Sequence, residues 1–230
     1  SEKGFNPTIP PVLVRENALF GTGFFPDDSD QVYEVQNDDL FLVGTSEVSL
    51  AALHTDEIID IENLPLRYAG YSTCFRREAG TYGKDTSGIF RVHQFDKVEM
   101  FSFCDPEKSN EEHEHILAIE EEILKDLEIP YRVVDVCTGD LGASAAKKYD
   151  IEAWIPSQKK YREVTSCSNT TDFQARRLNM RTKNEDGNTI LHTLNGTALA
   201  VGRILIALLE NNQQSDGSVM FSDDLGKMLG

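Results

Sequence analysis

Two short polar stretches contain residues whose types and spacing suit the binding of a nucleotide. The first is residues 75–78 (FRRE) and the second is residues 91–95 (RVHQF). Arginine binds phosphate through a planar, permanently charged guanidinium group, and phenylalanine offers a face on which a base can stack. On a strand, Arg91, Phe95 and Glu99 would share one face at intervals of about 13 Å. Such a face has the length for phosphates, adenine and one further group.

The same residues also fit a purely structural arrangement. Arg76, Glu78 and Arg91 would then form a cross-strand ion-pair cluster on a solvated sheet face, with Phe95 in the core. The spacing by itself leaves both interpretations open. The loop of residues 79–88 contains three glycines and is longer than most hairpin loops. Long ordered loops often have a functional role as lids.

A second group of candidate residues lies near the end of a predicted strand, residues 160–167. Glu163 and Ser166 could hold Mg²⁺ through one or two protein oxygens, with phosphate oxygens of a substrate completing the shell. Simple alternation places Glu163 with Thr165, so Ser166 reaches the same ion only if a bulge or twist intervenes. An ordinary strand end with turn-forming residues explains the same sequence.

A third candidate is Arg203, which follows a stretch rich in small residues, 192–202. An arginine in these apolar surroundings needs an anionic partner, because an unpaired buried charge is costly. The partner is either a protein carboxylate or a ligand phosphate, and the sequence favours neither.

The elements that must position these residues follow from periodicity and from turn-forming residues. The prolines of residues 4–14 predict an extended edge or interface strand. Ile116, Ile119, Ile123 and Leu127 predict one apolar face of a helix over 108–128, with glutamates and two histidines, His113 and His115, on its solvated face. The other expected elements are a loop at 21–39, strands at 41–44, 66–78, 89–104, 131–137, 149–155 and 160–167, and helices at 46–54, 141–148 and from after residue 197 to about 211.

Composition restricts the classes of function. The net charge of −17 argues against broad binding to nucleic acid or to anionic membrane, because such binding depends on neutralising phosphates. We find no apolar run near the ~20 residues of a spanning helix and no basic signal-peptide start, so we expect a cytoplasmic protein without a membrane partner. Four widely spaced cysteines predict buried free thiols. Without repeats or a linker, residues 1–230 are expected to form a single α+β domain.

Taken together, the motifs resemble those of class II aminoacyl-tRNA synthetases. The pattern Phe-Arg-x-Glu, a loop, then Arg-x-x-x-Phe is similar to motif 2 of that class, and the glycine-spaced stretch that ends at Arg203 is similar to motif 3. Further segments resemble the catalytic domain of the bacterial seryl-tRNA synthetase family, from about Gly4 to the end of the chain. They are residues 45–47 (TSE), 93–99 (HQFDKVE), 137–142 (CTGDLG), 149–156 (YDIEAWIP) and 172–177 (DFQARR).

The resemblance implies an antiparallel β-sheet flanked by helices, in which ATP and Mg²⁺ convert L-serine to seryl-adenylate before transfer to tRNA(Ser). It implies a catalytic role for two arginines, Arg76 at the α-phosphate and Arg203 at the γ-phosphate. It implies adenine stacking on Phe95 and Mg²⁺ held by Glu163 and Ser166. The implied ATP-binding residues are Arg76, Arg77, Glu78, Arg91, Val92, Phe95, Glu163, Val164, Thr165, Ser166 and Arg203. The implied serine-binding residues are Thr45, Ser46 and Glu47 for the amino group, and Glu99, Asn195 and Thr197 for the hydroxyl.

The family is expected to form homodimers and to carry an N-terminal helical arm that reaches across tRNA. The chain shows no counterpart of that arm, and its last ten residues depart from the expected proline-containing ending. Two alternative functions therefore stay open at this point. One is a free-standing paralogue that charges a carrier protein or another acceptor, and the other is a non-catalytic nucleotide-binding module.

Overall fold

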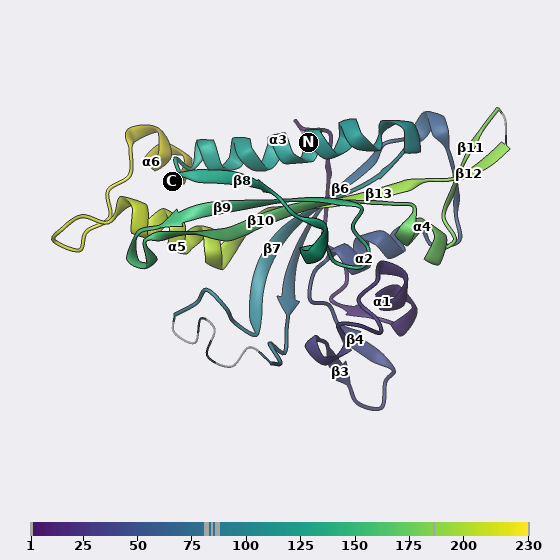
Figure 1. Ribbon diagram of the computed structural model, residues 1–230, viewed down its shortest axis with the longest axis horizontal. Helices are drawn as coiled ribbons and strands as arrows, with labels where there is room; N and C mark the ends of the chain where they lie inside the picture. Colours follow the sequence, from purple (N-terminus) through teal and green to yellow (C-terminus); the bar gives the residue numbers. More distant parts are fainter. Residues whose placement is uncertain (1, 81–82, 84, 86–87, 186, 230) are drawn as a thin grey trace.

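The computed structural model describes residues 2–80, 83, 85, 88–185 and 187–229, without the side chains of 228 and 229. Its centre is a seven-stranded sheet in the order β1-β6-β7-β13-β10-β9-β8 (Figure 1). All its neighbouring strands pair antiparallel except β1 and β6. The strands are β1 (Asn6–Thr8), β6 (Leu66–Phe75), β7 (Gln94–Cys104), β8 (Tyr131–Asp135), β9 (Lys147–Ile155), β10 (Lys160–Thr171) and β13 (His192–Ala200). The expected fold class, an antiparallel sheet flanked by helices, is confirmed.

Two three-stranded sheets and several helices surround the central sheet. The small sheets are β12 (Gly187–Ile190), β11 (Arg181–Asn184) and β5 (Ile58–Asp60), and β2 (Leu13–Val14), β4 (Leu40–Leu42) and β3 (Tyr33–Val35). The α-helices are α1 (Glu16–Thr22), α2 (Glu47–Ala51), α3 (Ser109–Asp126), α4 (Phe173–Arg177), α5 (Val201–Asn212) and α6 (Asp223–Leu229).

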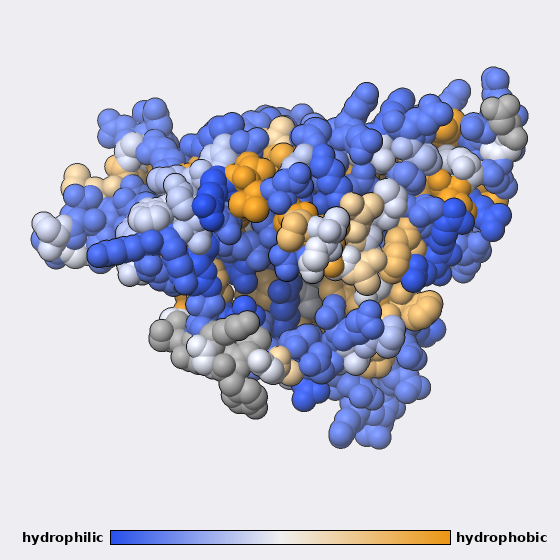
Figure 2. Space-filling model, viewed as in Figure 1, coloured by the Kyte–Doolittle hydropathy of each residue, from blue (hydrophilic) through white to orange (hydrophobic). Residues whose placement is uncertain are grey.

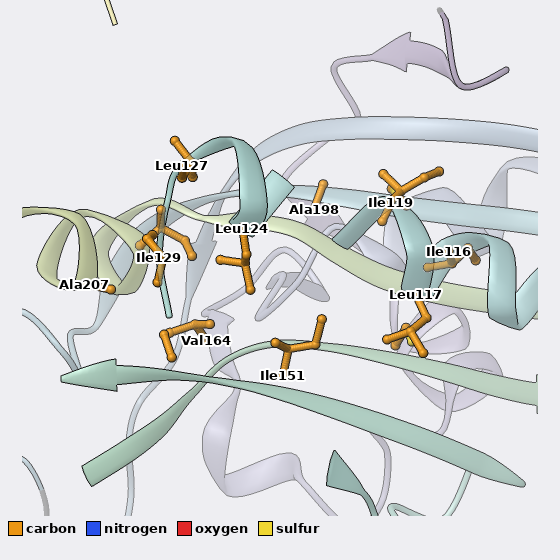
Figure 3. Close-up of a cluster of buried hydrophobic side chains, with 14 of the residues drawn as sticks. Ile116, Leu117, Ile119, Leu124, Leu127, Ile129, Ile151, Val164, Ala198 and Ala207 are labelled. Carbon is orange, nitrogen blue, oxygen red and sulfur yellow. The ribbon is translucent and has the colours of Figure 1, made fainter. Parts of the chain in front are cut away.

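Helices α3 and α5 cover one face of the central sheet. The apolar side of α3 packs against β13 and β10, and α5 packs against β9 and β7. Figure 3 shows the resulting core, where Ile116 and Leu124 of α3 face Ile151 of β9 and Val164 of β10. The helix predicted over 108–128 is confirmed, and its burial explains why α3 forms on this face.

The opposite face of the sheet is only partly covered. Leu50 of α2 and Ala175 of α4 pack with Phe101 and Phe103 of β7 in a second apolar cluster. The rest of this face carries polar side chains from β7, β13 and β10. The molecular surface seen in Figure 2 is mostly hydrophilic, as the high content of charged residues predicts. None of the described helices is long and apolar enough to cross a membrane.

The predicted helix after residue 197 was wrong in its first turn. Residues 192–200 form β13, and α5 begins only at Val201. The small residues serve a close helix-to-sheet contact, because a Cβ atom on Gly196 would lie 2.4 Å from Ile116 Cγ2. Pairing of β13 with both β7 and β10 outweighs the local preference for helix.

The predicted helix at 141–148 was also wrong. Residues 141–146 contain turns, and β9 already begins at Lys147, opposite Asn169 of β10. The amide of Ala146 donates to the Asn169 carbonyl at 2.9 Å, so the backbone joins the sheet before a helix can form. In the stretch expected as a loop, 21–39, the structure instead contains the end of α1 and the short strand β3.

The two long strands are shorter than predicted at the ends that face their connecting loop. Strand β6 stops at Phe75 and β7 starts at Gln94, so Arg76, Glu78 and Arg91 lie in the connecting segments. Glu78 has a positive φ of 52°, which ends the extended conformation. The predicted loop 79–88 lies partly outside the described residues.

The structure corrects the expectation for the solvated face of the helix and confirms the expectation for three of the four cysteines. Glu112 and Glu120 are buried in α3 rather than solvated, and His113 is buried as well, because the helix lies against the sheet along a wider face than its isoleucines indicate. Cys137 is exposed, whereas Cys74, Cys104 and Cys167 are buried free thiols as predicted.

Candidate active site

The partly open face of the sheet contains a cavity that brings most of the predicted site residues together. Side chains of β7, β13 and β10 line it. The segment before α2, the segments that follow β6 and precede β7, and the start of α5 form its rim. The predicted residues that line it are Thr45, Glu47, Arg76, Glu78, Arg91, Val92, Phe95, Glu99, Glu163, Val164, Thr165, Ser166, Asn195, Thr197 and Arg203. Ser46 is buried and Arg77 is exposed, and neither lines the cavity.

One end of the cavity is rich in arginine. The guanidinium of Arg76 lies 5.2 Å from the centre of the Phe95 ring, and its Nε donates to the Gly44 carbonyl at 3.1 Å. Among the described residues we find no ion pair for Arg76. Its charge is therefore held in place by neutral groups, which suits the binding of an external anion.

Arg91 and Glu78 form the ion pair that the structural interpretation expected, with Arg91 Nη1 2.5 Å from Glu78 Oε2. Phe95, however, is not a core residue, because it is partly exposed and lines the cavity. The ion pair and the cavity therefore coexist at this end of β7.

Arg203 reaches the same end from the start of α5. Burial lowers the pKa of its guanidinium, with the Glu163 carboxylate acting in the opposite direction. Arg203 Nη1 donates to the Glu163 carbonyl at 3.0 Å and lies 3.7 Å from its Oε1. The protein carboxylate that the sequence left open is thus Glu163, and Arg203 also lies over the Phe90 ring.

A β-bulge in β10 brings Glu163 and Ser166 to one side. Glu163 pairs with Glu152 of β9, whereas Thr165 pairs with the very next residue, Ile151, so Val164 is the extra residue. The extra residue reverses the alternation of side chains between the two faces of β10, so Glu163 and Ser166 both line the cavity. The condition that the sequence set for a shared ion is therefore met. A carboxylate and a hydroxyl are hard oxygen ligands of the kind that Mg²⁺ prefers.

The other end of the cavity is acidic. Glu47, the first residue of α2, accepts hydrogen bonds from Gln174 Nε2 at 2.8 Å and from Asn195 Nδ2 at 3.0 Å. Burial, and then the nearby Glu99 carboxylate, raise the pKa of Glu47 from 4.5 to about 7. A half-buried carboxylate with amide partners stabilises a cation that comes close to it.

Glu99 lies across from Glu47 and has different partners. It forms an ion pair with Lys97, two residues earlier on the same face of β7. Thr197, directly opposite on β13, donates from its Oγ1 to Glu99 Oε2 at 3.3 Å. Lys97 Nζ also donates to Thr45 Oγ1 at 2.8 Å, so one ammonium connects two predicted serine-binding residues.

A third carboxyl group lies behind the floor of the cavity. Glu120 of α3 is fully buried and accepts a hydrogen bond from Thr165 Oγ1 at 2.8 Å. Its Oε1 lies 2.8 Å from the position of a Cβ atom on Gly196, so it packs directly on β13. Burial raises the pKa of Glu120 well above 4.5.

We expect the free energy of unfolding to fall less with rising pH in the Glu120→Gln variant than in the native protein. A carboxyl whose pKa is raised by folding contributes stability below its unfolded-state pKa, and this contribution is lost as pH rises towards the folded-state pKa. The difference in unfolding free energy between variant and native protein should therefore grow with pH above about pH 4.5, by up to about 1.4 kcal/mol per pH unit. Urea denaturation from pH 5 to 8 measures it, and parallel curves for the two proteins would contradict it.

Sequence reasoning missed three residues that shape the site: Lys97, Gln174 and Glu120. Lys97 shares its face with Glu99 by simple alternation and could have been assigned on that ground. Gln174 belongs to a motif that carried the resemblance, although its contact with Glu47 spans 127 residues. Glu120 gave no signal, because it sits in a run of three glutamates that suggests a solvated surface.

Comparison with known proteins identifies the family. A family model described as the tRNA synthetase class II core domain (G, H, P, S and T) matches residues 31–212. The chain belongs to this family. The serine--tRNA ligases of Corynebacterium glutamicum and Acidothermus cellulolyticus are 58% and 60% identical to this class II core over 230 and 227 of its residues, which is 100% and 99% of the chain. The chain spans about half the length of these curated relatives, 54% in each case.

Solved structures show the same class II core. Seryl-tRNA synthetase from Pyrococcus horikoshii complexed with ATP superposes with a TM-score of 0.95 at 55% identity, over 98% of this chain and 51% of that chain. The cytoplasmic serine-tRNA ligase of Naegleria fowleri in complex with AMP gives a TM-score of 0.91 at 39% identity, over 98% of this chain and 54% of that chain.

Proposed function

We propose that this chain is the catalytic domain of a serine--tRNA ligase, which activates L-serine with ATP and transfers it to tRNA(Ser). The observation that carries the proposal is a single cavity with arginines at one end and the Glu47–Glu99 pair at the other. The first end suits the phosphates of ATP and the second suits an amino acid that has an ammonium and a hydroxyl group. The names of the relatives and the ATP and AMP bound in two of them support it.

In this proposal a carboxylate oxygen of serine attacks the α-phosphorus of ATP, a P–O bond forms, and pyrophosphate leaves. Arg76 stabilises the negative charge that develops on the α-phosphate, because its guanidinium is positioned before the reaction. Phe95 stacks on adenine, and Arg203 holds the γ-phosphate. No side chain acts as a covalent nucleophile, so positioning and electrostatics supply the rate enhancement.

Glu163 and Ser166 fit a Mg²⁺ site, since the bulge at Val164 places both on the wall of the cavity. A bound Mg²⁺ would offset the charge of the phosphates. The Arg203 guanidinium lies near Glu163 and would have the phosphates of bound ATP as a second anionic partner.

Assembly and location follow from the same assignment. We propose a homodimer in the cytoplasm, with residues 1–230 as one catalytic domain. The family resemblance and the almost fully exposed Ile9 beside edge strand β1, 87% accessible, support an interface there.

Serine-dependent exchange of labelled pyrophosphate into ATP tests the proposed function without tRNA. Exchange with serine, but not with alanine, threonine or glycine, is the expected result. Absence of exchange in a folded sample that binds ATP contradicts serine activation. Charging of a purified carrier protein in place of tRNA would instead support the free-standing paralogue.

A further inference from the structure

The two carboxylates at the amino-acid end of the cavity have partners of different charge. Glu47 receives hydrogen bonds from the neutral amides of Gln174 and Asn195. Glu99 receives the ammonium of Lys97 and the hydroxyl of Thr197. The charge of Glu99 is therefore compensated within the protein by direct contact, and for Glu47 we find no ion pair among the described residues.

Burial strengthens the effect of the charged partner that Glu99 has and Glu47 lacks. Glu99 and Lys97 are 2% and 6% exposed, so water does little to screen their charges. The Lys97 ammonium is further fixed by Thr45 Oγ1 at 2.8 Å, which leaves it little freedom to move away from Glu99. A ligand that enters the cavity therefore meets a carboxylate that needs a cation at Glu47, and a neutral ion pair at Glu99.

We propose that Lys97 is a specificity-determining residue that makes Glu99 an acceptor for a neutral hydroxyl group and excludes a second ammonium group. This inference rests on the proposed function. It predicts discrimination between serine and L-2,3-diaminopropionate, in which an ammonium replaces the hydroxyl. In the native protein the second ammonium would approach the buried Lys97 charge, and like charges at such a site repel strongly.

Removal of Lys97 reverses the electrostatic balance. Glu99 would then be a buried carboxylate without its cation, which is unfavourable unless it takes up a proton or a new cation. Diaminopropionate supplies that cation from its side chain, whereas serine does not. Loss of Lys97 should therefore favour the diamino acid over serine.

The test compares pyrophosphate exchange driven by serine and by L-2,3-diaminopropionate in the native protein, in Lys97→Met and in Lys97→Gln. We expect the native protein to prefer serine, and both neutral variants to lower the serine-to-diaminopropionate ratio of kcat/KM by at least about tenfold. Lys97→Arg keeps the charge and should keep the preference for serine, even if its rate falls.

Lys147→Met is the matched control, because Lys147 pairs with Glu114 at 3.2 Å on the outer surface, outside the cavity. Its ratio should equal that of the native protein. If a neutral variant folds but shows no exchange, the ratio of the two dissociation constants from calorimetry replaces the kinetic ratio under the same criterion.

Two results separate the possible failures. Exchange with serine in the native protein and an unchanged ratio in folded Lys97→Met and Lys97→Gln would overturn the role of Lys97 and leave the proposed function intact. No exchange with serine in the native protein would overturn both. An equal drop in Lys147→Met would show that the effect is not specific to the cavity and would also overturn the inference.

Discussion

Replacement of Arg76 by alanine is expected to lower serine-dependent pyrophosphate exchange by a factor of ~10² to 10³. The loss should appear mainly in kcat, because Arg76 would act on charge that develops at the α-phosphate as the bond to serine forms. Its guanidinium is held by the Gly44 carbonyl and the Phe95 ring, so its removal leaves no buried carboxylate unpaired among the described residues. The fold should therefore survive the substitution.

Arg132→Ala provides the control for this experiment. Arg132 also lies over an aromatic ring, that of Tyr161 at 4.9 Å, but it is exposed on edge strand β8. It forms an ion pair with Glu152 at the surface, and such pairs contribute little, so we expect this variant to retain exchange within about twofold. Equal exchange in native protein and Arg76→Ala, measured at saturating ATP and serine, would exclude the assigned role of Arg76.

The second large effect is expected for Glu47→Gln, which should raise the serine concentration for half-maximal exchange by ~10². The amide keeps the shape of the side chain and a hydrogen-bond acceptor but removes the charge that would pair with the serine ammonium. Glu57→Gln is a matched control, because Glu57 pairs with His54 outside the cavity. An unchanged serine requirement in Glu47→Gln would show that the ammonium binds elsewhere.

The pH dependence gives this prediction a second readout. The pKa of Glu47 is raised to about 7, mainly by burial. Below pH 7 the free protein holds Glu47 protonated, and serine binding must displace that proton. The apparent serine affinity should therefore fall about tenfold for each pH unit below 7 and stay constant above it. Glu47→Gln should show no such slope between pH 5.5 and 8.5.

Much of the fold was predictable because it depends on local periodicity. The isoleucine spacing of α3 identified a helix whose buried face the structure confirms, and the strand expected at 89–104 is present from Gln94 to Cys104. Predictions failed where pairing with distant strands decided the conformation. Residues 192–200 carry small residues that suggest a helix start, yet β13 is held between β7 and β10.

The candidate site divides in the same way. Alternation along one strand was enough to assign Phe95 and Glu99 to one surface, since it is a local property. Arg91 was assigned to the same face on this ground, but it lies before β7 and reaches the cavity from the connecting segment. The sequence could state only that Glu163 and Ser166 would need a bulge to share an ion. It could not predict the bulge at Val164, because a bulge is defined by the register of the partner strand.

The sequence by itself determined which chemical groups are present and the family to which the chain belongs, since the motifs survive as short local patterns. Only the tertiary structure decided the charge state and partners of those groups. Lys97 meets Thr45 across 52 residues, and Glu120 meets Thr165 across 45. Burial and pairing are properties of such long-range contacts, so no local pattern reveals that Lys97 neutralises Glu99 while Glu47 keeps two amide partners.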